Sequence, residues 1–358
     1  MSLTVLPPRV LLGVYRDERL ASPSNFWRNI GGFSANTFQS TSPNIIFEQI
    51  DSDRKVAPFV LPTNTGRPTY KRRGSEAKSF SPAYIKPRDP VVPSEQFTRR
   101  PGNLFDDTPR SPQQNWDAEV ADILKHHRSI IERRWELMCA QAMIYAKVRV
   151  DYEDGPSVIV DFDRDADLTE IKTTNFWDES HDIFRDLQEY SDRMANAKFG
   201  GLAATLIVGR EVWPRMQKNQ GLLEHMDTTM KNGQVDMVRG LIPSTTPDSP
   251  FVVVGRIGTL TIVLYNDFYE DDAGNQVDFM NPRDIVLTSA NVGGVMAFGA
   301  ILDAKAGLQA LPVFPKMWEQ EDPSALNIMT QSAPLPILTH PNRTFHARVV
   351  EEDSNSGG

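Results

Sequence analysis

The longest periodic run of apolar residues extends from about residue 115 to residue 146. Bulky side chains recur there at steps of three and four residues, which is the spacing of one face of an α-helix. The pattern predicts a helix of about 30 residues and about 45 Å, capped by Asn115. His127 and Arg134 interrupt the stripe, which argues against a coiled coil. The positions on this face are Val120, Ile123, Leu124, His127, Ile131, Arg134, Trp135, Met138 and Ala142.

A hairpin and a second helix are predicted to follow. The segment from Lys147 to Phe162 reads KVRVDY, EDGP and SVIVDF, which predicts two strands with a turn at Gly155. The second helix is predicted to take its cap from Asn175 and to end before Gly200 and Gly201. Its apolar face consists of Trp177, Ile183, Phe184, Leu187, Tyr190 and Met194.

Strands and helices then alternate irregularly. Two hairpins are predicted, one turning between Gly255 and Gly258 and one closed by Asp272 to Asn275, and the run QSAPLPIL needs strand partners far upstream. Helices with hairpins, rather than a strict β-α-β order, predict an α+β fold and argue against a doubly wound nucleotide-binding sheet. The predicted segments are a strand at 203–209, helices at 212–218 and 222–230, and strands in DIVLTS and VMAFGAILD.

Proline sets the first third of the chain apart. Residues 1–112 contain 14 of the 26 prolines, a density that prevents long helices and central strands. Aromatic residues such as Phe26, Trp27 and Phe33 nevertheless recur through it. An extended chain offers these side chains little local surface to pack on. The sequence therefore predicts an arm whose apolar residues are buried against neighbouring subunits.

The charge is unevenly distributed. The net charge is -9, which argues against a dedicated nucleic-acid binder. Residues 51–100 contain eleven Lys and Arg but only five acidic residues, so this window carries +6 and the remainder carries -15. Such a segment can bind the acidic body of another copy of the chain. The pairs Arg72-Arg73 and Arg99-Arg100 could also belong to a solvated loop or contact DNA phosphates, although prolines disfavour a stacking platform for bases.

Candidate catalytic and metal-binding residues are few. Asp161, Asp163, Asp165 and Asp167 alternate like the ligands of a calcium loop, but Ala166 and Lys172 stand where an EF-hand has Gly and Glu. An acidic turn is the favoured interpretation. No metal site, cofactor site or catalytic residue is predicted, and no apolar run of about 18 residues indicates a membrane span. His126 and His127 are adjacent and point apart, and Cys139, the only cysteine, is expected to be a buried apolar residue.

Three blocks carry specific motifs. SPAYIKPRDPV (81–91) is followed by TRRPGN (98–103), and NPRDIVLTSANVGGVMAFGAILD (281–303) has a strand, turn, strand pattern. FPKMWEQEDPSALNIMTQSAPLPIL (314–338) contains aromatic-Pro-Lys, Trp, Asp-Pro and Gln-Ser-Ala-Pro-Leu in that order. With the long helix between the first and second blocks, the chain resembles the phage lambda major head protein family, major capsid proteins of tailed bacteriophages, over roughly residues 45–350.

The resemblance implies a Hong Kong 97-type capsid fold with a long spine helix. Its loop is expected to supply the assembly contacts Arg72, Arg73, Lys78, Tyr84, Lys86, Arg88, Arg99 and Arg100. Isopeptide cross-links from Lys71, Lys78 or Lys86 to Asn327 or Asn342 are not predicted. The implied parts are an N-terminal arm (1–50), an extended loop (51–105), a peripheral domain (106–200, spine helix 115–146), an axial domain (201–310), a return to the peripheral domain (311–350) and a flexible tail (351–358).

The implied function is non-enzymatic self-assembly into the icosahedral shell around the double-stranded DNA of a tailed phage. The expected partners are many copies of the chain as hexamers and pentamers, together with portal, scaffold and decoration proteins. DNA would be enclosed without sequence-specific binding, and no membrane would be involved. The expected location is the virion, after assembly in the host cytoplasm. Two alternatives remain open: an encapsulin-type compartment protein of the same fold, and a hydrolase with a dispersed site that uses Asp163 or His181.

Overall fold

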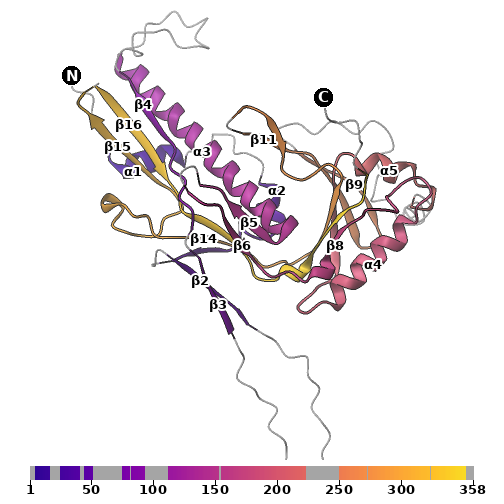
Figure 1. Cartoon of the computed structure of the whole chain (residues 1–358). Coiled ribbons are helices and arrows are strands. Elements are labelled where there is room, and N and C mark those ends of the chain that lie inside the picture. The colour runs from indigo at the N-terminus through magenta and orange to yellow at the C-terminus, as the bar shows by residue number, and fades with distance from the viewer. Residues whose placement is uncertain are drawn as a thin grey trace, which may run out of the picture.

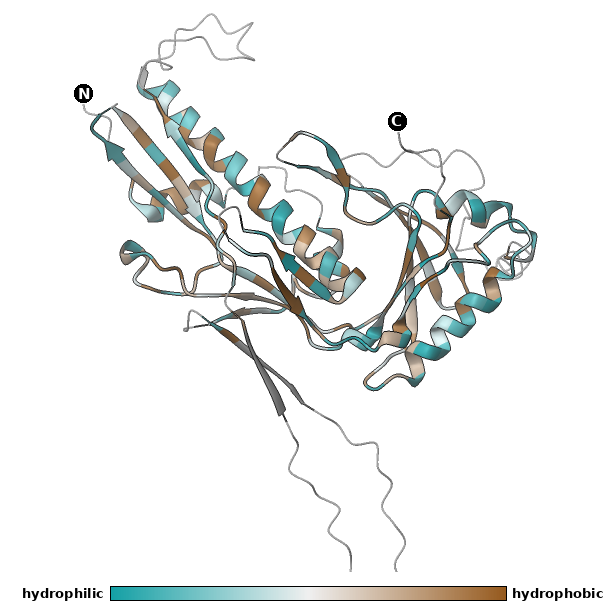
Figure 2. Ribbon diagram, viewed as in Figure 1, coloured by the Kyte–Doolittle hydropathy of each residue, from teal (hydrophilic) through white to brown (hydrophobic). Residues whose placement is uncertain are grey.

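The structure is a computed structural model with two lobes, one built around a long helix and one around a six-stranded sheet (Figure 1). Helices and strands are mixed within the chain, so the predicted α+β class is confirmed. In Figure 2 the long helix presents hydrophobic and hydrophilic residues in alternation along its length. The structure describes residues 5–16, 25–40, 44–50, 75–80, 82–92, 112–152, 155–222, 250–271, 273–322 and 324–351.

The predicted long helix is α3, Pro112–Tyr145, which has 34 residues. It begins three residues before Asn115, with proline in the first turn, where a missing N–H costs nothing. Arg134 is exposed, so its predicted place in the apolar stripe was wrong; it lies at the edge of the face that packs inward. Along the first half the helix buries one stripe, whereas its last turns are buried on most sides. The buried positions of the stripe are Val120, Leu124, His127, Ile131, Trp135, Met138 and Ala142.

Two small sheets and a hairpin pack around α3. Leu124 on the helix and Ile328 on a strand share one apolar cluster, so helix and sheet bury each other's apolar faces. The predicted hairpin is confirmed as β5 and β6, with Lys147 opposite Asp161. The strands are β15 (Phe314–Gln320), β16 (Ala325–Gln331) and β4 (Arg88–Val91) in the first sheet, β1 (Thr37–Gln39), β14 (Gly294–Phe298) and β17 (Pro334–Leu338) in the second, and β5 (Lys147–Val150) and β6 (Val158–Asp161) in the hairpin.

The second lobe is a mixed six-stranded sheet. Strand β10 is parallel to β8 and β18 is parallel to β7, whereas the other neighbours are antiparallel, so the sheet is not doubly wound. Its apolar cluster includes residues of two helices, α4 (Ile183–Asn196) and α5 (Val212–Lys218). In order across the sheet the strands are β7 (Thr169–Ile171), β18 (Thr344–Arg348), β13 (Asp284–Ser289), β8 (Ala203–Val208), β10 (Leu260–Tyr265) and β9 (Phe251–Ile257).

Shorter elements complete the chain. The predicted turn near residues 272–275 joins β11 to β12, and the hairpin of β9 and β10 turns at Gly258, whose φ of 58° is left-handed. Residue 222 is helical, but the rest of the helix predicted at 222–230 and most of the tail at 351–358 lie outside the described residues. These short elements are β11 (Phe268–Glu270), β12 (Gln276–Asp278) and the 3-10 turns η2 (Ala166–Leu168), η4 (Ala304–Ala306) and η5 (Pro341–Arg343).

The cap of α4 differs from the prediction. Asp182 caps the helix by accepting a hydrogen bond from the Arg185 N–H at 3.0 Å. Asn175 lies eight residues before the first residue of the helix and has a φ of 55°, so it does not cap it. Trp177 is buried but precedes the helix. Asn is favoured both in turns and at helix caps, which is why the pattern misplaced the start of this helix.

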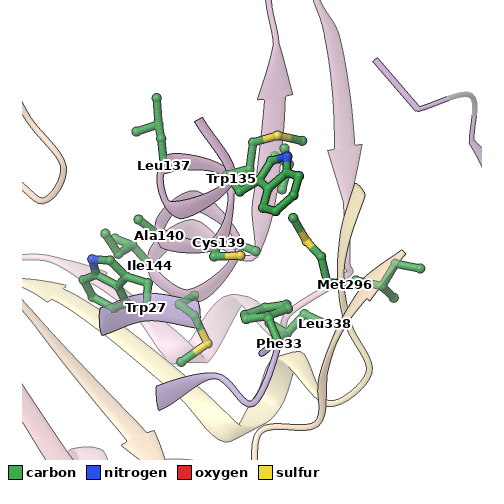
Figure 3. Close-up of a cluster of buried hydrophobic side chains, with 14 of the residues drawn as sticks. Trp27, Phe33, Trp135, Leu137, Cys139, Ala140, Ile144, Met296 and Leu338 are labelled. Carbon is green, nitrogen blue, oxygen red and sulfur yellow. The ribbon is translucent and has the colours of Figure 1, made fainter. Parts of the chain in front are cut away.

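The N-terminal segment packs on its own chain. Helix α1 (Pro8–Tyr15) lies against α3 and β15, helix α2 (Phe26–Ile30) lies against α3, and β1 pairs with β14 in parallel. Trp27 and Phe33 are fully buried beside Cys139 and Met296 of the main cluster (Figure 3). The prediction that these aromatic residues require neighbouring subunits was therefore wrong. Their nonlocal partner is the spine helix of the same chain.

The last strand also departs from the expected organisation. After residue 311 the chain was expected to return to the unit of the long helix, and β16 and β17 do pack against that helix, with β15 paired to β16. Strand β18 instead lies between β7 and β13 in the six-stranded sheet. Phe345 and Ala347 are fully buried there, in the cluster that also contains α4. Alternation of apolar residues predicts such a strand but does not say which sheet it completes.

Candidate assembly surface

A two-stranded ribbon projects from the lobe of α3 (Figure 1). It consists of β2 (Ile45–Ile50) and β3 (Ser75–Phe80), antiparallel from Ile45 opposite Phe80 to Ile50 opposite Ser75. Its two strands pair only with each other among the described strands. The outer edges of such a ribbon present backbone N–H and C=O groups that can pair with another chain.

The root of the ribbon is anchored in the main apolar cluster. Ile45 is fully buried there, and Phe80 packs against the same cluster. Beyond the ribbon, Ile85 exchanges two backbone hydrogen bonds with Ser332, at 2.9 and 3.0 Å. Strand β4 then pairs with β16, from Arg88 opposite Met329 to Val91 opposite Leu326. The chain that leaves the ribbon is thus hydrogen-bonded to the body.

Three of the predicted contact residues lie at this root. The Tyr84 hydroxyl donates to the backbone oxygen of Ala300, and the Lys86 ammonium lies 4.9 Å from the centre of the Tyr84 ring. Arg88 donates from Nε and Nη2 to Asn327 Oδ1, at 3.1 and 3.0 Å. These side chains fasten residues 82–92 to their own body. Their part in contacts between subunits stays a prediction.

The other predicted contact residues are not brought together with these three. Lys78 lies on β3 opposite Phe47, and only its backbone position is described. The remaining four, Arg72, Arg73, Arg99 and Arg100, lie outside the described residues.

A buried histidine, for which the sequence indicated no partner, connects α3 to the strands at the root of the ribbon. His127 of α3 is fully buried, with Nε2 2.9 Å from Asp89 Oδ2 and Nδ1 2.9 Å from Thr330 Oγ1. Burial lowers the pKa of His127, against the opposing effect of Asp89. The partners lie 38 and 203 residues away, so no spacing in the sequence indicated them. The three groups join α3, β4 and β16.

The arrangement of His127 does not support catalysis. Asp89, His127 and Thr330 are hydrogen-bonded in series, as in a catalytic triad. Thr330 is fully buried, however, and no substrate can reach its hydroxyl. For the alternative hydrolase, His181 Nε2 lies 2.8 Å from Asp186 Oδ2 beside an open hollow of about 820 Å³. Asp163 is not among the described residues that line this hollow. The structure therefore does not bring Asp163 and His181 into one described site.

Two further observations concern metals and membranes. Within the described ranges, no three His, Cys, Asp or Glu side chains are grouped so that they could hold a metal ion. The backbone N–H of Asp163 donates to Asp161 Oδ1 at 2.9 Å, a contact typical of an acidic turn. No described helix is both long and apolar enough to cross a membrane.

Known proteins resemble this chain over most of its length. The family described as "Phage major capsid protein E" matches residues 21–349. The major capsid protein of Enterobacteria phage P21 is 26% identical over 328 residues, covering 87% of this chain and 90% of that protein. The major capsid protein of Escherichia phage lambda is 24% identical over 325 residues, with the same coverage.

Solved structures agree on the fold. A capsid protein of an Escherichia coli CFT073 prophage superimposes with a TM-score of 0.71 at 19% identity, covering 97% of this chain and all of the other. The mature capsid subunit of bacteriophage PhiM1 gives a TM-score of 0.51 at 9% identity, covering 92% of this chain and 88% of that one. The capsid fold expected from the sequence is confirmed.

Proposed function

This chain belongs to the phage major capsid protein E family, and we propose from this premise that many copies of it build the shell of a phage head. The protein is structural rather than enzymatic, as its family is. It is a component of the virion. Membership of this family also favours a phage head over the encapsulin-type compartment.

The observation that carries this proposal is the projecting ribbon of β2 and β3. A two-stranded ribbon alone in water is at best marginally stable, so its extension needs a surface to lie on. Its root is held on the body by the burial of Ile45, by the pairing of β4 with β16 and by the hydrogen bond between His127 and Asp89. The locked root would give each copy a loop of defined direction for contact with the next copy. Repeated contacts of about 2,000 Å² or more would close the shell.

The finer partners are part of the same proposal. The copies would assemble as hexamers and pentamers in the host cytoplasm, with portal, scaffold and decoration proteins. Double-stranded DNA would be enclosed without sequence-specific contacts. The net charge of -9 supports this, because an acidic wall repels phosphate and does not bind the packaged DNA. A positively charged inner wall would contradict it.

Electron microscopy of the full chain, purified after expression, tests the shell. Negative staining should show closed shells or rings. Particles of a single subunit under every assembly condition would contradict the proposal. Shells formed by the chain alone would show that scaffold and decoration proteins are dispensable for closure.

The double variant Arg72→Glu/Arg73→Glu tests the basic loop. It should fold with an unchanged melting temperature but form few or no shells, because the loop would then repel an acidic neighbour. Arg72→Lys/Arg73→Lys keeps the charge and should still assemble. Shell yield by microscopy and sedimentation separates the two variants. If the glutamate variant unfolded, the loop would belong to the core of the subunit instead.

A further inference from the structure

Helix α2 is capped by a side chain from another helix. Asn25, at its N-terminal end, makes no side-chain cap hydrogen bond. The backbone N–H groups of Trp27 and Arg28 donate to Glu136 Oε1 and Oε2, at 2.6 and 3.2 Å. Glu136 lies on α3 and is only 1% exposed. A buried carboxyl therefore holds α2 against the spine helix.

The same short helix contacts the second lobe. The Phe26 ring stacks on Tyr265 of β10 at 5.0 Å and lies 4.8 Å from Phe251 of β9. On the other side, the Arg28 guanidinium lies 5.2 Å from the centre of the Trp135 ring of α3. Helix α2 therefore fills the junction between α3 and the edge of the six-stranded sheet. Moving it would change the contact between the lobes.

The charged and titratable groups around Glu136 come from every element of this junction. Arg28 lies on α2, Arg133 and Cys139 lie on α3, Tyr265 lies on β10, and Asp267 follows β10. Asp267 Oδ1 accepts from Arg133 Nη2 at 2.7 Å, whereas its Oδ2 is buried with no partner among the described residues. The buried Arg28 Nε and Trp135 Nε1 also have no partner there. The junction is thus polar, buried and incompletely paired among the described residues.

Such surroundings favour a neutral carboxylic acid. Burial raises the pKa of Glu136 to about 7, and Asp267 adds to the rise, while the two N–H donors and Arg28 oppose it. The ordinary value is 4.5, so the docked state binds the proton more tightly than a solvent-exposed carboxyl does. The stabilisation of docking is complete below about pH 4.5 and is lost as the pH rises through about 7.

We propose that this junction is a proton-controlled latch, in which neutral Glu136 keeps α2 docked between the lobes and ionised Glu136 releases it. Release frees the N-terminal segment from α3 and loosens the contact between the lobes. The latch belongs to the single subunit. It can therefore hold or fail independently of the proposed shell assembly.

Hydrogen exchange of the unassembled full chain tests the latch. Exchange at about pH 6 and about pH 8, corrected for the intrinsic rate of each amide, should show residues 25–36 losing protection by up to about tenfold at the higher pH. The amides of β13 at the centre of the six-stranded sheet should be unaffected. Equal protection of residues 25–36 at the two values would overturn the proposal.

Three variants assign the effect to Glu136. Glu136→Gln keeps one of the two acceptor oxygens and removes the titrating group, so the protection of residues 25–36 should be the same at both pH values. Glu132→Gln, one turn earlier on α3, should keep the wild-type pH dependence. Asp267→Asn removes a negative neighbour and should move the transition to lower pH. A pH dependence of protection that persists in Glu136→Gln would overturn the latch. If Glu136→Gln does not fold, the latch is overturned by an Asp267→Asn variant that loses protection at the same pH as the wild type.

Discussion

At the scale of single residues, His127 decides how the root of the loop is held. Its ring stands between Asp89 of β4 and Thr330 of β16, and all three belong to segments far apart in the chain. A buried polar group is costly when it loses its partner, and the cost is larger than the net gain of making the bond. The sequence placed His127 on the inward face of the helix, but only the packed structure supplied its partners.

Replacing His127 by Ala should destabilise the subunit by about 2–3 kcal/mol, because Thr330 is left unpaired and a cavity forms. Urea unfolding measures this loss. The matched variant His126→Ala removes the exposed neighbouring ring and should change the free energy of unfolding by no more than about 0.5 kcal/mol. Equal losses in the two variants would contradict the role given to His127.

The buried ring also predicts a pH dependence. Because burial lowers the pKa of His127 below its ordinary value of 6.5, the folded state binds a proton less readily than the unfolded chain. The stability that depends on the neutral ring is present above about pH 6.5 and is lost as the pH falls through the lowered pKa. Urea titrations between about pH 7 and pH 5 should show this decline in the wild type. The decline should be smaller in His127→Ala.

At the scale of elements, the start of α4 shows what local patterns leave undecided. The apolar face predicted the helix, and Ile183, Leu187, Tyr190 and Met194 are buried as expected. The cap is Asp182 rather than Asn175, because the choice depends on which backbone N–H groups the fold leaves open. The two candidates are equivalent by residue type alone.

Removing the cap with Asp182→Ala should lower the free energy of unfolding by about 1 kcal/mol. The variant Asp182→Asn should be nearly neutral, because asparagine caps helices about as well as aspartate. Chemical unfolding followed by circular dichroism compares the variants. A loss of the same size in both would indicate that the charge of Asp182 matters rather than the capping hydrogen bond.

At the scale of the whole molecule, two strands from opposite ends of the chain complete the sheets. Strand β1 joins β14 and β17 beside α3, whereas β18 lies between β7 and β13 in the six-stranded sheet. The main apolar cluster includes Ile144 of α3 together with Ile207 and Val286 of that sheet. The lobes therefore share a core, and we expect them to unfold together.

Ending the chain after residue 343 should unfold the second lobe and, through the shared core, the first lobe as well. The truncation removes β18, exposes the edges of β7 and β13, and deletes Phe345, whose ring stacks on Tyr190 at 4.4 Å. Each large apolar side chain removed costs about 2–3 kcal/mol, which is a large part of a typical domain's stability. Near-ultraviolet circular dichroism should lose its native signal. A chain that ends after residue 351 serves as the control and should keep it.

The sequence by itself determined the elements whose signal is local. The spine helix, the β5–β6 hairpin, α5 and the strands of the 203–298 region follow from periodicity and turn residues, and the three motif blocks identified the family and with it the fold. The motif block at 81–91 also contained Tyr84, Lys86 and Arg88, although their intrachain partners could not be seen from it.

Only the tertiary structure decided which surfaces these elements cover. An apolar pattern says that a side chain will leave water, but burial is non-directional and does not name the partner. The aromatic N-terminal residues could therefore pack on their own spine helix instead of a neighbour, and β18 could complete the second lobe instead of the first. The cap that Glu136 gives α2 joins groups more than 100 residues apart, and such partners meet only once the chain is packed.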